Sequence, residues 1–169
     1  MKLMIISDIH GGIDNLNTCL EIFNKEQYDK LFILGDLFNY GIDYNRTEII
    51  EKLNSFSGNI IAVRGNCDIN INEIIFNMPS TQEINLNNKK IVMSHGDLYT
   101  ENDLLKSDSD IILVGHSHKS KIEKVNNKII INPGSITKSR DECNSFGVIF
   151  DNKIYIKNLN NEIIKEYNI

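Results

Sequence analysis

Five short polar segments, each placed directly after an apolar run, constrain the fold of this chain more than any other feature. The run KLFIL, for example, ends at Gly35 and is followed by Asp36 in the segment GDLF. Apolar runs of this length bounded by Gly are typical of buried strands. The five segments share residues that bind metal ions, and they are SDIH (Asp8, His10), GDLF (Asp36), GN (Asn66), SHG (His95) and GHSH (His116, His118). We interpret Asp36 as a carboxylate that bridges two metal ions, whose sites the other segments complete.

The first half of the chain alternates between predicted strands and helices. Gly11 and Gly12 allow a tight turn after the first strand, and Asp14 is positioned to cap the helix that follows. Consecutive strands joined by a helix pair in parallel through a right-handed crossover. The predicted elements are a strand at 2–6, a helix at 14–26, a strand at 31–34, a helix at 47–56 and a strand at 59–63.

From Thr81 onward the pattern changes to apolar or alternating runs that are broken by Asn-Asn or Asp-Asn pairs. Asn tolerates the left-handed backbone of two-residue turns, so these pairs predict hairpins. A short helix at 101–107 and the strand DIILV interrupt the hairpins, and the weakly patterned segment 69–78 is predicted to be a loop with one helical turn. The hairpin runs are EINLNNKKIVMSH, KIEKVNNKIIIN, GVIFDNKIYIKNL and LNNEIIKEY. The whole pattern predicts an α/β fold with two sheets face to face and helices outside, in one domain over residues 1–169.

The histidines support a shared site. The chain has only four, and each follows an apolar run beside Gly or Asp. Taken singly, each fits a capped or hydrogen-bonded loop residue, and Asp36 alone fits a turn residue or a helix cap. Those alternatives do not explain why no histidine falls elsewhere. Ligand sites in α/β sheets lie beyond the carboxyl ends of the strands, which is where all five segments are predicted to be.

The residue types also restrict the metal. Asp, His and Asn give an oxygen and nitrogen set without thiolate, which suits Mn²⁺, Fe²⁺, Co²⁺, Ni²⁺ or Zn²⁺ and neither a Cys-rich zinc site nor an all-oxygen Ca²⁺ site. Asp8 and His10 are separated by one residue, so in an extended segment both point to the same side and can reach one ion. His116 and His118 have the same spacing in a predicted loop, where they can diverge to different ions.

The ordered motifs SDIHGG, GDLF, RGNCD, SHGD, GHSH and NPGS resemble those of the calcineurin-like metallophosphoesterases, and the short length resembles the small bacterial and archaeal phosphodiesterase branch. The resemblance implies a four-layer α/β/β/α sandwich of two mixed sheets and a dinuclear centre, usually active with Mn²⁺. It assigns one ion to Asp8, His10 and His118, the other to Asn66, His95 and His116, and the bridge to Asp36. It also implies hydrolysis of a phosphodiester by a metal-bridging hydroxide, with Asp36, His10 and Asn66 in catalytic roles.

Two positions depart from that family pattern. Many relatives have a catalytic His directly after the ligand Asn, where this chain has Cys67, so the proton donor for the leaving group is open. Asp97 replaces another frequent His. If an imidazole stood at position 67, we expect that Asp68 could orient it.

Three further segments have weaker signals. Arg64 and Arg140 could each bind a phosphate, although a structural ion pair is the favoured interpretation for both. The turn Pro133, Gly134 and Ser135 is expected to support the GHSH loop.

Composition limits the partners. The net charge of −5 argues against a protein that follows nucleic-acid phosphates, but not against a small phosphoester substrate near bound cations.

Three dispersed cysteines favour a reducing compartment, and no apolar run approaches the length of a membrane span. With an N-terminal apolar run too short for a signal peptide, we expect a cytoplasmic protein without a membrane partner. A homo-oligomer is left open. The alternatives to an enzyme on small phosphodiesters are a non-catalytic binding scaffold like the retromer subunit on this fold, and a repair exonuclease, which the short acidic chain disfavours.

Overall fold

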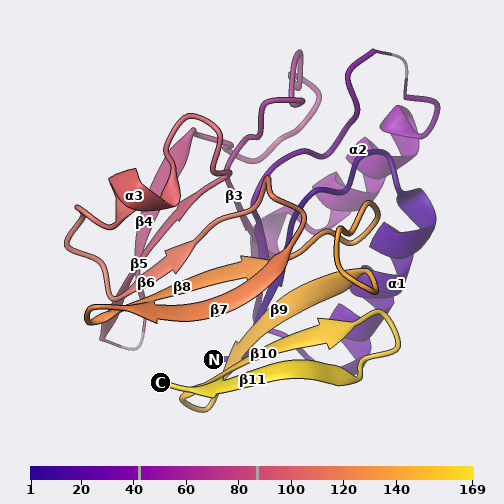
Figure 1. Cartoon of the computed structure of the whole chain (residues 1–169). Coiled ribbons are helices and arrows are strands. Elements are labelled where there is room, and N and C mark those ends of the chain that lie inside the picture. Colours follow the sequence, from indigo (N-terminus) through magenta and orange to yellow (C-terminus); the bar gives the residue numbers. More distant parts are fainter. Residues whose placement is uncertain (42, 87) are drawn as a thin grey trace.

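Two mixed sheets make up the centre of the computed structural model, which describes residues 1–41, 43–86 and 88–169 (Figure 1). The order of strands in sheet A is β11 (Ile163–Asn168), β10 (Lys153–Asn158), β9 (Ser145–Phe150), β1 (Leu3–Ile6), β2 (Lys30–Ile33) and β3 (Ile60–Ala62). The order in sheet B is β4 (Thr81–Leu86), β5 (Lys89–Ser94), β6 (Ile111–Leu113), β8 (Lys128–Pro133) and β7 (Ser120–Val125). Strands β1, β2 and β3 are parallel, and so are β5, β6 and β8.

Helices cover the outer faces of the two sheets. The apolar faces of α1 (Ile13–Lys25) and α2 (Arg46–Ser55) pack on sheet A, where Leu16 and Phe23 join the same cluster as Met4. On sheet B, Leu104 of the short helix α3 (Glu101–Leu104) packs on the outer face. The predicted α/β/β/α sandwich is therefore confirmed, with a fourth layer that is much thinner than the first. None of the described helices is long and apolar enough to cross a membrane.

The strand β1 shows why its sequence is apolar without interruption. Leu3 and Ile5 face sheet B, whereas Met4 and Ile6 face α1, and all four side chains are fully buried. A parallel strand covered on both sides cannot alternate polar and apolar residues. Each such side chain contributes about 1.5–3 kcal/mol to stability when fully buried. The buried strand thus fixes its own carboxyl end, where the first polar segment begins.

Several boundaries differ from the prediction. Helix α1 begins at Ile13 with Gly12 at the N-cap, so Asp14 lies in the first turn and makes no cap hydrogen bond. The reason is that Ile13 is buried against the core and extends the helix by one residue. Among the described residues, segment 69–78 has no helix, but it contains a single turn in which the Ile74 N–H donates to the Ile71 carbonyl at 3.0 Å, and α3 ends at Leu104.

The hairpin turns agree with the prediction. Asn88, Asn126 and Asn152 have positive φ of 62°, 55° and 58°. Asn87, the other residue of the first predicted turn, lies outside the described residues. The second half is less purely antiparallel than expected, because β6 inserts in parallel between β5 and β8.

Candidate metal centre

All seven predicted ligands lie at one edge of the sandwich, where loops from both sheets meet. Asp8 and His10 follow β1, Asp36 follows β2 and Asn66 follows β3. From sheet B, His95 follows β5, and the loop after β6 carries His116 and His118. Parallel strands share the direction of their carboxyl ends, so each sheet brings its polar segments to the same edge.

The first group of side chains contains Asp8, His10 and His118. Asp8 Oδ1 lies 3.2 Å from His118 Nε2 and 3.8 Å from His10 Nε2. The Nε2 atoms of the two histidines are 3.2 Å apart. All three potential ligand atoms therefore face one point, close enough together to hold one ion.

The second group contains Asp36, His95 and His116. Asp36 Oδ2 is 3.3 Å from His95 Nε2, and His95 Nε2 is 3.2 Å from His116 Nδ1. The same Asp36 oxygen is 3.6 Å from His10 Nε2 in the first group. Asp36 consequently lies between the two groups, in the position that a bridging carboxylate requires.

Backbone carbonyls fix the protonation of three imidazoles. The Nδ1 atoms of His10, His95 and His118 lie 3.2, 2.6 and 2.8 Å from the carbonyl oxygens of residues 38, 34 and 138. A carbonyl oxygen can only accept, so each Nδ1 carries a hydrogen that it donates. In the neutral rings Nε2 then presents a lone pair, which is the arrangement of metal-binding histidines.

Unpaired atoms provide an independent test of whether a cation fits. Asp8 Oδ1 and Asn66 Oδ1 are buried and have no hydrogen-bond partner among the described residues. The lone pairs of His10 and His118 face each other across 3.2 Å. Buried acceptors without donors are costly, and a divalent cation is what such a mixed oxygen and nitrogen set would bind. The residues present therefore fit two divalent ions.

The backbone at these residues is not extended, contrary to the prediction for Asp8 and His10. Both have left-handed dihedral angles, with φ of 55° and 44°. Asp36, His116 and His118 share this conformation, with φ of 54°, 63° and 58°. The chain turns sharply after each strand, so Asp8 and His10 converge because the loop curls rather than because alternate side chains share a face.

A close approach between two loops holds Asp36 in place. A side chain at Gly35 would come within 2.4 Å of the Gly65 nitrogen, and one at Gly65 within 2.2 Å of Asp36 Oδ1. The buried Asp68 carboxylate accepts hydrogen bonds of 2.8 Å from the backbone N–H groups of Gly65, Asp36 and Leu37. Asp68 thus joins the loops after β2 and β3. The carboxylate has about four acceptor sites and three are used, so the expectation that it could orient an imidazole at position 67 stays a prediction.

Electrostatics favour an ionised Asp36 at the centre of the site. Burial acts to raise its pKa, but hydrogen bonding and the charge of His95, together with the Cys67 N–H, lower the pKa to about 2. Burial and the neighbouring Asp36 charge raise the pKa of Cys67 to about 12. The Cys67 thiol is 7% exposed and borders the metal pocket, so at neutral pH a protonated thiol lies beside the site.

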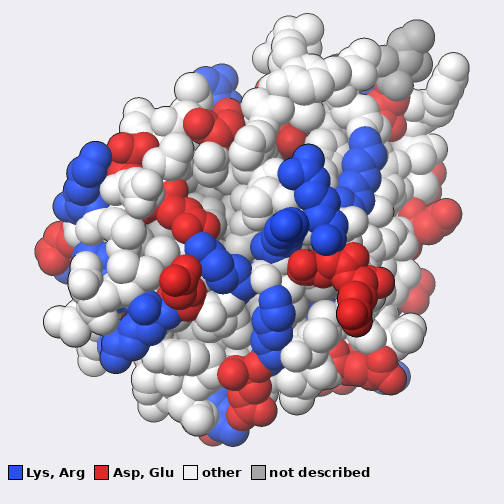
Figure 2. All heavy atoms as spheres, viewed as in Figure 1, with Lys and Arg blue, Asp and Glu red and all other residues white. Residues whose placement is uncertain are grey.

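The open pocket over the two groups has a volume of about 490 Å³, and two cationic side chains, Lys138 and Arg140, line it. Arg140 lines it, whereas Arg64 does not and instead contacts Ser80. Neither arginine forms an ion pair with an acidic side chain in the described part of the chain, so the favoured ion-pair interpretation does not hold. Lys138 also lines the pocket, next to Asn39. Lys and Arg side chains gather near the middle of the face drawn in Figure 2, over β7 and the segment after β8.

Two pocket residues, Lys138 and Tyr40, were missed by sequence reasoning. The Tyr40 hydroxyl lies 2.6 Å from Asn66 Nδ2 although Tyr40 is 65% exposed. The sequence holds only a weak signal for either residue. Tyr40 lies two residues after Phe38 in a loop, and Lys138 lies three residues after the NPGS segment.

The NPGS segment supports two loops rather than the GHSH loop alone. Asn132 Nδ2 donates to the Gly115 carbonyl and the Ser117 hydroxyl, at 2.8 and 3.0 Å. The buried Ser135 hydroxyl donates to the Asp8 carbonyl at 2.8 Å. The segment therefore ties together the loops that carry the first group.

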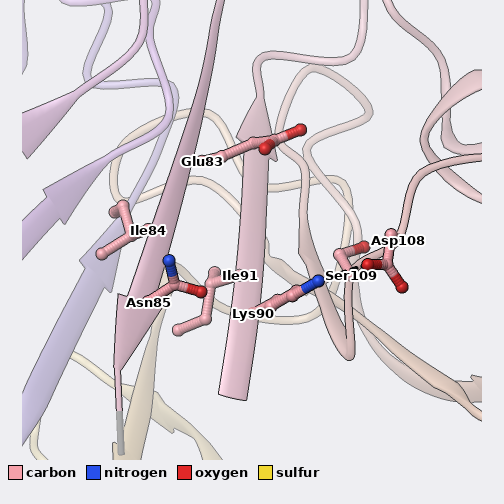
Figure 3. A pocket seen from close by; sticks show the side chains of 7 residues that line it. All are labelled: Glu83, Ile84, Asn85, Lys90, Ile91, Asp108 and Ser109. Atoms are coloured by element: carbon pink, nitrogen blue, oxygen red, sulfur yellow. Dashed lines mark hydrogen bonds and ion pairs between the residues drawn. The ribbon is translucent and has the colours of Figure 1, made fainter. Parts of the chain in front are cut away.

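A separate pocket of about 270 Å³ lies on sheet B, remote in the fold from the seven ligands (Figure 3). Lys90 forms an ion pair with Asp108 at this pocket. The lining residues are Glu83, Ile84, Asn85, Lys90, Ile91, Asp108 and Ser109. This lining has neither histidine nor cysteine, so the candidate chemistry lies in the pocket over the two groups.

Comparisons with known proteins agree with this geometry. A model of the calcineurin-like phosphoesterase superfamily domain matches residues 1–153. Phosphodiesterase YfcE of Escherichia coli K12 is 31% identical over 175 residues, which cover 97% of this chain and 95% of YfcE. Phosphodiesterase MJ0936 of Methanocaldococcus jannaschii is 29% identical, over 79% of this chain and 83% of that protein. The structure of YfcE, described as a phosphoesterase, has a TM-score of 0.92 at 28% identity and covers 100% of both chains. Zn²⁺-complexed Vps29 of Entamoeba histolytica shares the fold, with a TM-score of 0.68 at 22% identity over 100% of this chain and 98% of that one.

Proposed function

The chain belongs to the calcineurin-like phosphoesterase superfamily and is a metal-dependent phosphodiesterase, and we propose how its residues divide that work. Asp8, His10 and His118 would hold one ion, and Asn66, His95 and His116 the other, with Asp36 shared. The proposed metal is Mn²⁺. We also propose that residues 1–169 form a single domain and that the protein is located in the cytoplasm. The observation that supports the assignment is the clustering of the two groups beside two buried acceptors that have no hydrogen-bond donor among the described residues, Asp8 Oδ1 and Asn66 Oδ1.

The bound ions would supply an activated water and neutralise charge on the phosphoryl oxygens. The protein's own residues do the rest. Asp36 Oδ1 accepts the Cys67 N–H at 2.8 Å, which locks the carboxylate so that Oδ2 faces both groups. Lys138 and Arg140 place positive charge at the pocket mouth and would orient an anionic diester. The Cys67 thiol offers a weak proton donor at most.

Chelation tests this proposal directly. Extensive dialysis against a chelator should abolish hydrolysis of bis-(p-nitrophenyl) phosphate, and added Mn²⁺ should restore it. Full activity in protein verified as metal-free would refute the assignment. The same Mn²⁺-loaded enzyme should then be assayed against cyclic nucleotides, nucleotide anhydrides and glycerophosphodiesters, because its substrate is proposed only as a small phosphodiester.

A further inference from the structure

The amide of Asn66 has an asymmetric set of partners. Its oxygen Oδ1 is buried without a hydrogen-bond donor. Its nitrogen Nδ2 lies 2.6 Å from the Tyr40 hydroxyl and 3.4 Å from Cys67 Sγ. An amide nitrogen has two hydrogens to donate, and here two acceptors lie within hydrogen-bond distance of it. The amide is therefore held through its nitrogen, while its buried oxygen has no donor among the described residues.

Tyr40 has no packing role that explains this contact. Its side chain is 65% exposed and comes from the loop after β2, while Asn66 comes from the loop after β3. The hydroxyl nevertheless reaches Asn66 across the mouth of the pocket, which both residues line. The remaining acceptor, the Cys67 sulfur, is weak and lies farther away.

We infer that Tyr40 is a positioning residue, whose hydroxyl accepts from Asn66 Nδ2 and thereby keeps Asn66 Oδ1 available to a divalent cation. The inference rests on the proposed function, since it concerns one of the two proposed ions. Without the hydroxyl the amide can turn about its terminal torsion, because oxygen and nitrogen have nearly the same shape. The turned amide would present NH₂ to the cation, which it cannot bind.

The test uses the full chain and compares Tyr40→Phe with Tyr44→Phe. Tyr44 is in the same loop and 94% exposed, so its variant controls for loss of a surface hydroxyl. Mn²⁺ binding to the metal-free proteins would be followed by titration calorimetry, with electron paramagnetic resonance to distinguish paired from single ions. Tyr40→Phe should weaken one of two sites by about 10–100-fold, as loss of groups that orient ligands typically does. Tyr44→Phe should leave both sites unchanged, and excess Mn²⁺ should restore turnover of Tyr40→Phe.

A double-mutant cycle separates positioning from a direct role. In an Asn66→Ala background there is no amide to orient, so Tyr40→Phe should cause no further loss of affinity at that site. A loss that persists in this background would overturn the inference, because the hydroxyl would then act on the ion or its water directly. Thermal unfolding of the metal-free variants checks that each one folds.

The outcomes also separate this inference from the proposed function. If the wild type binds no pair of ions, the metal assignment fails and the inference fails with it. If the wild type binds two ions and is active, while Tyr40→Phe binds both with unchanged affinity, only the role of Tyr40 is refuted.

Discussion

Left-handed backbone occurs both in the hairpin turns and at the metal centre, but among the described residues the centre adds histidine to the Asn and Asp that adopt it in the turns. In the hairpins it falls on Asn or Asp, whose short polar side chains tolerate it. At the centre it falls on three histidines and two aspartates, and these are the candidate ligands His10, His116, His118, Asp8 and Asp36. Left-handed geometry costs a typical side chain about 1–2 kcal/mol. The turns are thus built from residues that tolerate this backbone, whereas three positions of the centre have histidine, a residue that binds a cation.

The same contrast appears in what holds each region. Hairpin turns need only their flanking strands. The loops of the centre are cross-linked by buried polar groups, such as Asp68 to three backbone N–H groups and Ser135 to the Asp8 carbonyl. Strained functional geometry persists only where its surroundings over-determine it. The comparison therefore predicts that the left-handed backbone at the centre lowers the free energy of unfolding but places the ligands correctly. In the hairpin turns the same backbone should cause no such loss of stability.

The largest expected effect comes from Asp36→Asn. Asn tolerates the left-handed backbone, so the loop should keep its shape while the bridging charge is lost. Activity on bis-(p-nitrophenyl) phosphate should fall by more than about 100-fold, since even groups that only orient ligands are worth 10–100-fold. Metal content, measured by elemental analysis, should fall at both sites together. Two tightly bound ions with normal turnover would show that Asp36 is not the bridge.

The next largest effect is expected from His116→Gly, which tests whether placing a ligand on left-handed backbone lowers the stability of the protein. Gly removes a candidate ligand and relieves left-handed strain at φ 63°. Turnover should fall by about 10-fold or more, while the metal-free protein should unfold at the same temperature or a higher one, with a gain of up to about 1 kcal/mol. The matched control is Asn126→Gly in a hairpin turn, which should change neither activity nor stability by much. If metal-free His116→Gly unfolds at a clearly lower temperature than the metal-free wild type, the left-handed backbone at position 116 does not destabilise the protein and this prediction is wrong.

These regions also differ in how far the sequence predicts them. The strands and all seven candidate ligands follow from apolar runs and the residues after them, because a buried strand fixes where its carboxyl end emerges. The Asn turns follow from local propensity. The curled backbone at Asp8 and His10 does not, because it depends on hydrogen bonds to the loop after β2. Tyr40 and Lys138 likewise reach Asn66 and Asn39 across 26 and 99 residues of sequence, and no local pattern encodes such approaches.

A smaller effect is expected from Lys138→Met. This variant tests whether a residue outside the left-handed ligand positions also contributes to substrate binding. The ammonium group at the pocket should bind the diester anion, so its loss should raise KM by about 5–30-fold, which corresponds to a charged hydrogen bond of about 1–2 kcal/mol. The value of kcat should change much less. Lys119→Met is the control, since Lys119 is exposed next to His118 but does not line the pocket. Equal effects of both variants would indicate general surface charge rather than a specific contact.

The smallest effects on aryl diesters are expected at Cys67, which lies between the strained loops and has no left-handed backbone of its own. Its thiol stays protonated, with a pKa raised by burial and by Asp36, and is a poor general acid. Aryl diesters have stable leaving groups, so Cys67→Ser and Cys67→Ala should change their hydrolysis by less than about 3-fold, far below the 10²–10⁴-fold of a positioned acid. For the same reason an alkyl monoester such as glycerol phosphate should react more slowly than an aryl diester.

Cys67→His should help only where the leaving group needs a proton. Asp68 already accepts hydrogen bonds from three backbone N–H groups, which leaves it about one further acceptor site for the new imidazole, so the gain should remain below the upper end of the usual range for a general acid, about 10⁴-fold. A plot of log(kcat/KM) against leaving-group pKa should have a shallower slope for Cys67→His than for the wild type. Parallel lines, with both proteins fully loaded with metal, would show that leaving-group protonation is decided elsewhere. In that case the functional region would end at the left-handed ligands, and Cys67 would be a packing residue like Cys19, which is fully buried on the apolar face of α1.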